Sequence, residues 1–192
     1  MALLIGVKKI KTAVFISGTG SNLKNLIKFS KIEKSPISVD IIISNNKAKG
    51  LKFGKIFKIK KKVFDFKKKI KTEKEILFLL KKHEINLICL AGFMKILSNE
   101  FIKNFNGKIL NIHPSLLPKY KGLNTHQRAI NNKEKFSGCT VHYVSAKLDS
   151  GKIIKQKIVK INKSDTPRLL KKKILVQEHK LYPEAILKIF NL

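Results

Sequence analysis

The sequence predicts an α/β fold in which a mainly parallel, twisted sheet is flanked by helices. Short apolar runs that are typical of buried strands alternate with segments that have the apolar spacing of helices. Strands that are joined by helices and buried on both faces usually pair in parallel. At 192 residues, with 43% apolar and 28% charged residues, the chain also has the size and composition of one globular domain, which we expect to span residues 1–192.

The first predicted strand covers residues 11–17, and Gly18, Gly20 and Ser21 then open a helix whose apolar face includes Leu23. Such a loop directs backbone N–H groups and the helix dipole at an anion. Leu23 stands where a dinucleotide-binding motif has its third glycine, and no Gly-Lys-Ser/Thr follows. A single phosphate monoester therefore fits better, and a tight structural turn is the alternative.

The next predicted elements are a strand at residues 37–44, a turn at 45–50 that leads into a helix, and an exposed strand and loop within 55–71. Thr72 and Glu75 then suggest a capping box at the start of a helix that continues to about His83. A buried strand follows at residues 86–91. Residues 92–97 come at its carboxyl end, where open α/β sheets bind ligands.

A polar pair stands out in residues 109–122, where Asn111 and His113 are two positions apart in a predicted strand at 108–112. Side chains at i and i+2 point to the same face of a strand. An amide and an imidazole side by side can hold a developing oxyanion and move a proton. Pro114 and Pro118 stiffen the loop that follows. The alternative is a histidine that only satisfies a loop.

The C-terminal third is expected to hold a helix at residues 125–131, strands at 138–145 and 152–160, and a long last helix capped by Asp165 or Thr166. His142 alternates in phase with its strand, which favours a core histidine with a backbone partner. Asp149 lies in a Leu-Asp-Ser-Gly turn and has turn formation as its simplest explanation.

The apolar stripe of the last helix is defined by Leu170, Ile174 and Leu181, and Glu178 lies on this same stripe. A carboxylate on an apolar face needs a partner, so Glu178 points either to a ligand amine or to a salt bridge with a lysine. Pro183 is expected to kink or end the helix.

The formal net charge is +30, but only Arg128 and Arg168 are arginines. A surface that grips nucleic acid usually employs more arginine, so we interpret the lysines as compositional drift and expect no specific nucleic-acid partner. Residues 1–7 followed by lysines do not fit a secretory signal, and no apolar run reaches membrane-spanning length, which favours a cytoplasmic protein. Cys89 and Cys139 lie in apolar contexts typical of buried free thiols.

Several motifs in a fixed order resemble the folate-dependent formyltransferases. They are S-G-T-G-S-N at residues 17–22, A-G-F-M-K-I-L at 91–97, N-I-H-P-S-L-L-P-K-Y-K-G at 111–122, L-N-T-H-Q-R-A-I at 123–130, L-D-S-G at 148–151 and Q-E-H-K-L-Y-P at 177–183. The match is closest to the members that transfer a formyl group from 10-formyltetrahydrofolate to the amine of glycinamide ribonucleotide in de novo purine (IMP) biosynthesis. The resemblance implies a Rossmann-like formyltransferase topology.

The resemblance also implies roles for individual residues. Catalysis would fall to Asn111, His113 and Asp149. The ribonucleotide would be held at its phosphate by Gly20, Ser21 and Asn22 and near its amine by Glu178. Folate contacts would come from Asn111 and Asp149 together with Lys69, Met94, Lys95, Ile96, Leu97, Ser145, Ala146, Lys147 and Leu148. The partners would be glycinamide ribonucleotide and the formyl-folate co-substrate, with no metal and no membrane, and the protein would be a monomer or a homodimer.

The chain departs from the family pattern at Asn124, where many members have histidine, and at Lys152, where proline is common. Neither position is among the three residues assigned to chemistry. Methionyl-tRNA formyltransferase and formyltetrahydrofolate deformylase share the catalytic core and are alternatives, although each normally carries a further domain. A basic nucleic-acid-binding protein on an inactive α/β scaffold is the alternative from another class.

Overall fold

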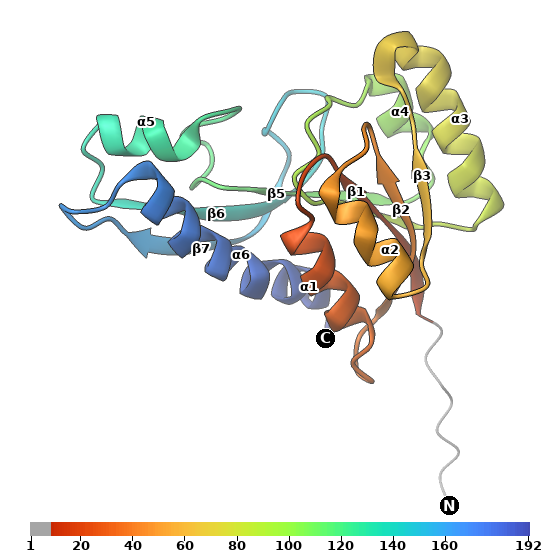
Figure 1. Cartoon of the computed structure of the whole chain (residues 1–192), viewed down its shortest axis with the longest axis horizontal. Helices are drawn as coiled ribbons and strands as arrows, with labels where there is room; N and C mark the ends of the chain where they lie inside the picture. The colour runs from red at the N-terminus through yellow and green to blue at the C-terminus, as the bar shows by residue number, and fades with distance from the viewer. Residues whose placement is uncertain (1–8) are drawn as a thin grey trace, which may run out of the picture.

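The computed structural model describes residues 9–192, which form one seven-stranded sheet with helices packed on both faces (Figure 1). The strands are β1 Ile10–Ile16, β2 Ile37–Ser44, β3 Lys60–Val63, β4 Leu87–Leu90, β5 Lys108–His113, β6 Phe136–Tyr143 and β7 Ile153–Lys160. The helices are α1 Ser21–Ser30, α2 Lys52–Ile56, α3 Lys69–Lys82, α4 Asn99–Asn104, α5 Thr125–Asn131 and α6 Pro167–Ile189, and there are two 3-10 turns, η1 Lys49–Leu51 and η2 Phe66–Lys68. The apolar residues 1–7, on which the expectation about a secretory signal rests, lie outside the described residues.

The strand order is β3-β2-β1-β4-β5-β6-β7, and the first five strands run parallel. β6 and β7 add antiparallel pairs at one side. The prediction of a mainly parallel sheet is therefore confirmed. Because parallel strands end at the same edge, the carboxyl ends of β1, β4 and β5 lie close together, and this edge is where open α/β sheets bind ligands.

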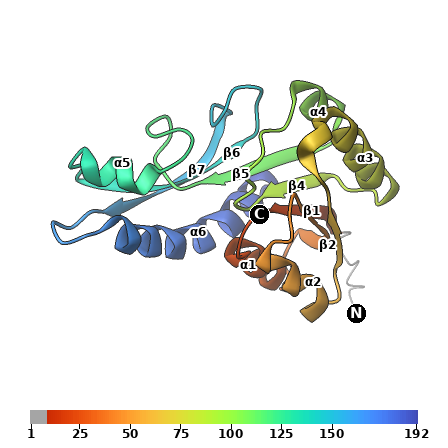
Figure 2. The same cartoon turned by 45° about the horizontal axis from the view of Figure 1, so that its top comes forward.

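Two apolar cores cover the two faces of the sheet. Helices α1 and α6 bury the first, which includes Leu23, Leu170, Ile174 and Leu181, so the inward stripe predicted for the last helix is confirmed. Helices α3 and α4 bury the second, which is centred on Phe15 and Phe101. Figure 2 shows α1, α2 and α6 grouped on one side and α3 and α4 on the other.

The predicted capping box at Thr72 is wrong, because α3 begins three residues earlier at Lys69. Thr72 and Glu73 are buried inside the helix and bind its neighbours. The Thr72 hydroxyl donates to the Asp65 carbonyl at 2.6 Å, and Glu73 Oε1 accepts from the Ser98 N–H at 2.9 Å. Polar residues that resemble a helix start in sequence therefore attach the helix to the chain around it.

The ends of the other elements depart from prediction in smaller ways. The short helix α4, capped by the Ser98 hydroxyl, has no counterpart among the predicted elements. The segment predicted as exposed strand and loop contains β3, but α2 extends into it as far as Ile56. Helix α6 is capped by Thr166 and continues through Pro183 to Ile189, so this proline does not end it. No helix among residues 9–192 has the length and apolarity to cross a membrane.

The prediction about the two cysteines is also confirmed. Cys89 and Cys139 are free and buried.

Asn124 is the N-cap residue of α5 and has left-handed backbone (φ 57°), a conformation that asparagine tolerates well. Lys152 lies exposed before β7. The two departures from the family pattern are thus accommodated locally.

Candidate active site

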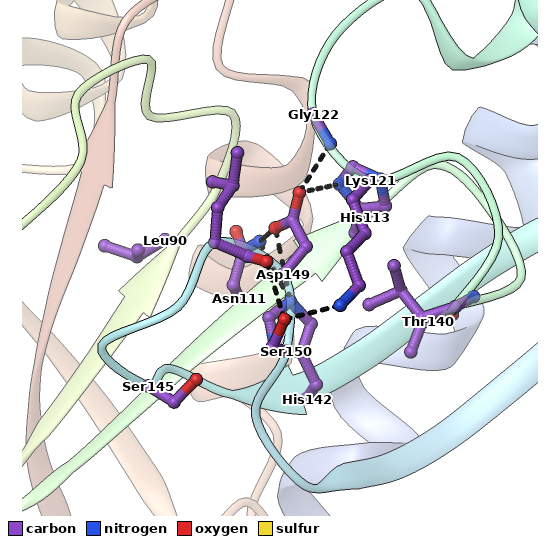
Figure 3. Close-up of polar contacts among 12 residues, drawn as sticks. Leu90, Asn111, His113, Lys121, Gly122, Thr140, His142, Ser145, Asp149 and Ser150 are labelled. Atoms are coloured by element: carbon purple, nitrogen blue, oxygen red, sulfur yellow. Dashed lines mark hydrogen bonds and ion pairs between the residues drawn. The ribbon is translucent and has the colours of Figure 1, made fainter.

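Asn111, His113 and Asp149 meet at the carboxyl end of β5 (Figure 3). The His113 Nδ1 atom lies 3.3 Å from Asp149 Oδ2, and Asn111 Nδ2 donates to Asp149 Oδ1 at 3.4 Å. Alternation along β5 places Asn111 and His113 on one face, as predicted. The loop after β6 then brings Asp149 to both of them.

The His113 ring is buried and has an oxygen atom opposite each nitrogen. Its Nε2 lies 2.9 Å from the Tyr120 carbonyl, and its Nδ1 faces Asp149. Burial lowers the pKa of His113 below its ordinary value, while the Tyr120 carbonyl and the Asp149 carboxylate act in the opposite direction. The neutral ring therefore predominates at neutral pH in the absence of ligand. Only the protonated ring donates to both oxygen atoms at once.

Asp149 does not by itself keep the His113 ring protonated at neutral pH. The carboxylate does favour the charged ring, but burial of the ring among the surrounding elements has the larger effect on its pKa. A histidine in this state gains a proton readily when negative charge develops beside it, since a nearby anion favours the protonated form.

Asp149 is ionised in this setting. Burial raises the pKa of Asp149, but the interaction with His142 and a hydrogen bond from the Gly122 N–H lower it by more than burial raises it. The net pKa therefore lies below the ordinary value. The Gly122 N–H donates to Oδ2 at 2.9 Å. Asp149 has left-handed backbone (φ 47°), which aspartate tolerates better than most residues do. The turn that this residue forms thus also positions its carboxylate.

His142 lies directly opposite Asn111 in the antiparallel pairing of β5 and β6. Its Nδ1 is 2.8 Å from the Tyr143 carbonyl and its Nε2 is 3.2 Å from Asn111 Nδ2. With Nδ1 donating to the Tyr143 carbonyl, Nε2 can accept from the Asn111 amide. The prediction of a core histidine with a backbone partner is confirmed, and the same side chain also orients the Asn111 amide. The register between the two strands is the signal that sequence alone lacked.

The glycine loop after β1 leads directly into α1, with Gly20 as the N-cap in left-handed backbone (φ 75°). A Cβ atom on Gly20 would lie 2.9 Å from the Cα of Gly50, so a close backbone approach also requires glycine here. The first N–H groups of a helix have no hydrogen-bond partner within the helix. In α1 these groups belong to Ser21 and the residues that follow it. The local geometry therefore offers an anion site.

Asn22 and Glu178 form a buried pair that links α1 to α6. The Asn22 Nδ2 atom donates to Glu178 Oε2 at 2.7 Å, and the Asn22 Oδ1 atom has no hydrogen-bond partner within residues 9–192. Burial raises the pKa of Glu178 to about 7, against the effects of Asn22 and Lys171. In the described part of the chain Glu178 pairs with an amide and not with a lysine, so the salt-bridge interpretation is wrong.

The residues assigned to folate differ in how accessible they are. Met94 and Ile96 are 64% and 59% exposed, whereas Leu97 is buried in the second core. Lys95 is exposed as well. The Met94 N–H donates to the Ser17 hydroxyl at 2.7 Å, which attaches this loop to the end of β1. Met94, Lys95 and Ile96 can therefore meet a ligand, while Leu97 can offer it only backbone atoms.

The other predicted folate residues lie in two separate places. Ser145, Ala146, Lys147 and Leu148 form the partly exposed loop that leads to Asp149, with the Ser145 hydroxyl bound to the Lys147 carbonyl at 3.1 Å. Lys69 is the half-exposed first residue of α3 and has no described hydrogen bond or ion pair with the other predicted site residues. Among residues 9–192, no group of three or more His, Cys, Asp or Glu side chains is placed to hold a metal ion.

The cluster at the end of β5 has the parts that formyl or acyl transfer requires. The Asn111 amide can donate to an oxyanion, His113 can carry a proton, and Asp149 supplies a fixed negative charge beside the imidazole. In the absence of ligand, both Asn111 Nδ2 protons have acceptors, at His142 Nε2 and Asp149 Oδ1. The 3.4 Å contact with Asp149 is the weaker one, so it is the contact that an oxyanion would replace.

Comparisons with known proteins agree with this geometry. The family model described as formyl transferase matches residues 10–186. The chain is 41% identical over 180 residues to phosphoribosylglycinamide formyltransferase of Haemophilus influenzae, which covers 92% of this chain and 85% of that protein. It is 36% identical to the enzyme of the same name from Bacillus subtilis, with 95% of each covered.

Solved structures and longer relatives point the same way. The crystal structure of phosphoribosylglycinamide formyltransferase from Brucella melitensis superposes with a TM-score of 0.89 at 41% identity, covering 95% of this chain and 96% of that one. The chain is also 42% identical to the human trifunctional purine biosynthetic protein adenosine-3, over 93% of its own length and 18% of that protein. The chain thus corresponds to one part of that larger polypeptide.

Proposed function

This chain belongs to the formyl transferase family, and from that premise we propose that it transfers the formyl group of 10-formyltetrahydrofolate to the amine of glycinamide ribonucleotide. The names of its bacterial relatives support glycinamide ribonucleotide as the formyl acceptor, and membership of the formyl transferase family supports the folate donor. The match to a part of the trifunctional purine protein supports a place in purine biosynthesis. The observation that carries the proposal is the contact of His113 with Asp149 beside Asn111.

In the proposed reaction the amine of glycinamide ribonucleotide attacks the formyl carbon, so that a C–N bond forms and the carbonyl oxygen becomes an oxyanion. Asn111 donates to this oxygen in place of its long contact with Asp149. His142 keeps hold of the other Nδ2 proton and so fixes the plane of the amide. The donor is thereby oriented before charge develops.

His113 responds to the same negative charge. Its lowered pKa leaves the ring neutral before reaction, and the developing oxyanion favours protonation of a ring whose nitrogens already face Asp149 and the Tyr120 carbonyl. The attacking nitrogen loses a proton, and the departing folate nitrogen gains one as its bond to the formyl carbon breaks. His113 or an ordered water carries this proton between them.

The ribonucleotide would bind between the glycine loop and α6. Its phosphate would meet the backbone N–H groups at Gly20, Ser21 and Asn22, where the α1 dipole also favours an anion. Its amine end would meet Glu178, whose buried carboxylate has one partner in Asn22. The unpartnered Asn22 Oδ1 atom is a second acceptor at that place.

The folate would bind on the other side of β5. The exposed Met94, Lys95 and Ile96 form one wall of the proposed pocket, with the Leu97 backbone behind them, and Ser145, Ala146, Lys147 and Leu148 form another. Lys69 would lie further out, near the carboxyl end of β3, where it suits an anionic part of the folate. These placements share the edge of the sheet where parallel strands end.

A spectrophotometric assay of folate product tests the proposal. We expect product from 10-formyltetrahydrofolate only when glycinamide ribonucleotide is present, and none with His113→Ala. Product without an acceptor would indicate a deformylase. Product only with methionyl-tRNA would indicate a tRNA formyltransferase. Either of these results, or no product with any acceptor, would contradict the proposed substrate.

A further inference from the structure

The turn at residues 119–122 contacts both members of the His113–Asp149 pair. The Tyr120 carbonyl lies 2.9 Å from His113 Nε2, and the Gly122 N–H donates to Asp149 Oδ2 at 2.9 Å (Figure 3 shows the Gly122 contact). Any displacement of this turn therefore changes the surroundings of the imidazole and of the carboxylate together.

Tyr120 holds its carbonyl in place with an unfavourable backbone conformation. Its φ is 55°, in the left-handed region that a bulky residue seldom adopts. Such a conformation is energetically unfavourable and persists only where surrounding contacts hold it. The contacts of the Tyr120 side chain show what holds it here.

The Tyr120 side chain is held at three points by α5 and the segment after it. Its hydroxyl donates to Glu134 Oε1 at 2.8 Å and accepts from Asn132 Nδ2 at 2.9 Å. The Arg128 guanidinium lies 5.1 Å from the centre of the tyrosine ring, and Arg128 Nη1 also donates to the Lys121 carbonyl at 2.7 Å. The turn is thus attached to α5 through both side chain and backbone.

We infer that Tyr120 is a positioning residue of the proposed formyl transfer, because its side chain fixes the turn whose backbone sets the orientation and protonation of His113 and Asp149. The inference rests on the proposed function. Tyr120 touches no reacting atom in this account and acts through the imidazole and the carboxylate. Glu134 supports the Tyr120 side chain by accepting a hydrogen bond from its hydroxyl.

The charged and titratable groups around His113 determine how its pKa should change when the Tyr120 contact is lost. Asp149 comes from the loop after β6, His142 from β6 itself, and Arg128 and His126 from α5. The hydrogen bond with the Tyr120 carbonyl favours the charged ring, and so does Asp149, whereas burial, His142 and Arg128 favour the neutral ring. Loss of the Tyr120 contact should therefore lower the pKa of His113 further.

The test compares Tyr120→Phe with the unmodified protein. The substitution removes only the phenol oxygen and keeps the ring beneath Arg128. We expect kcat to fall roughly 10-fold to 10²-fold, since small misplacements in a catalytic site have effects of this size, with KM for both substrates changed by less than about threefold. Titration of the His113 ring by ¹H–¹⁵N NMR should show protonation at lower pH than in the unmodified protein.

Variants at Glu134 and Gln127 provide matched comparisons. Glu134→Ala removes the acceptor of the phenol proton and should reproduce the effect of Tyr120→Phe, and the double variant should be no worse than either single one. Glu134→Gln keeps an acceptor oxygen and should retain most of the turnover. Gln127 is an exposed residue of α5 that donates to Asn131 Oδ1 at 2.7 Å and has no described hydrogen bond with Tyr120 or Glu134, so Gln127→Ala should leave kcat and the His113 titration unchanged.

Three results would overturn the inference. The first is a Tyr120→Phe protein with unchanged kcat and an unchanged His113 titration. The second is equal damage from Glu134→Gln and Glu134→Ala, and this pair decides the matter if Tyr120→Phe does not fold. The third is equal damage from Gln127→Ala. Failure of the proposed function is separate, because it would appear as absent formyl transfer in the unmodified protein, while the NMR titration still tests the contact.

Discussion

The Oδ2 atom of Asp149 lies 3.3 Å from Nδ1 of His113, in a buried contact between the loop after β6 and the end of β5. Asp149→Asn keeps the size of the side chain and suits the left-handed backbone, but it removes the charge. By analogy with orienting aspartates in other catalytic sites, we expect turnover to fall roughly 10²-fold to 10⁴-fold with both substrates still bound. Steady-state kinetics measure this.

Two further variants make that prediction specific. Asp165 is another buried aspartate, and its Oδ2 atom lies 2.6 Å from Lys173 Nζ. This pair is not part of the His113–Asp149 cluster, so Asp165→Asn should alter stability more than turnover. His113→Asn added to Asp149→Asn should cost little more, because residues that act as a unit are not additive. Two full independent losses would separate Asp149 from His113 in function.

Glu178→Gln should make the protein more stable and less active. The amide introduced by this substitution would still accept from Asn22 Nδ2 and would give the unpartnered Asn22 Oδ1 a donor. The folded-state pKa of Glu178, about 7, lies above that of an unfolded glutamate. The protonated form thus contributes stability that is complete below about pH 4 and is lost as the pH rises through about 7.

Thermal unfolding between about pH 5 and pH 8 checks this sign. The advantage of Glu178→Gln over the unmodified protein should grow with pH, toward a value on the order of 3 kcal/mol at the upper end. Glu184 lies on the same helix but pairs with Lys155 and Lys157, and these partners lower its pKa. Glu184→Gln should therefore show no such gain at high pH. Equal behaviour of the two variants would contradict the burial argument.

Gly20→Ala should destabilise the glycine loop, whereas Gly18→Ala should not. The left-handed backbone of Gly20 and the 2.9 Å approach of its would-be Cβ to the Gly50 Cα both oppose a side chain, at a cost of roughly 1–3 kcal/mol. A Cβ on Gly18 meets nothing within 4 Å. Stability against denaturant and affinity for glycinamide ribonucleotide should both fall for Gly20→Ala alone. Weaker folate binding of the same size would place the loop in the folate pocket.

The lysine-rich surface should not confer specific nucleic-acid binding. Any binding should be independent of sequence and should weaken steeply as salt approaches about 0.2 M, since phosphate contacts made by lysine release counterions. Fluorescence anisotropy with two duplexes of unrelated sequence measures it. Tight binding to one of them at that salt concentration would contradict the interpretation of the charge as compositional.

The spacing of apolar residues along the sequence made much of the fold predictable. The buried β2 and the amphipathic α5 have the predicted bounds, and β1 differs by one residue at each end, because their apolar patterns leave few alternatives. Thr72 and Glu75 misled the prediction, because they have the spacing of a capping box although Thr72 lies inside α3 and makes a buried contact with Asp65. The helix α4 was absent from it because six residues carry too little periodicity.

The candidate site also has features that the sequence predicted and features that it could not predict. The alternation that places Asn111 and His113 on one face is a local property, so the sequence predicted it. The contact of His142 with Asn111 depends on strand register, and the contact of Tyr120 with His113 depends on a left-handed residue that no local pattern requires. Such contacts arise between segments that are distant in sequence or in an unusual conformation, and only the folded chain reveals them.

Strand β3 has a consequence for the behaviour of the protein in concentrated solution. It is one of the two outer strands of the sheet, with β7 at the other edge, and all four of its residues, Lys60–Val63, are exposed. An unpaired outer strand is a template on which the strand of another molecule can assemble, and this is a common start of aggregation. Three consecutive lysines would bring like charges face to face in such a pairing. At this edge of the sheet, charge repulsion therefore opposes strand pairing between two copies of the chain.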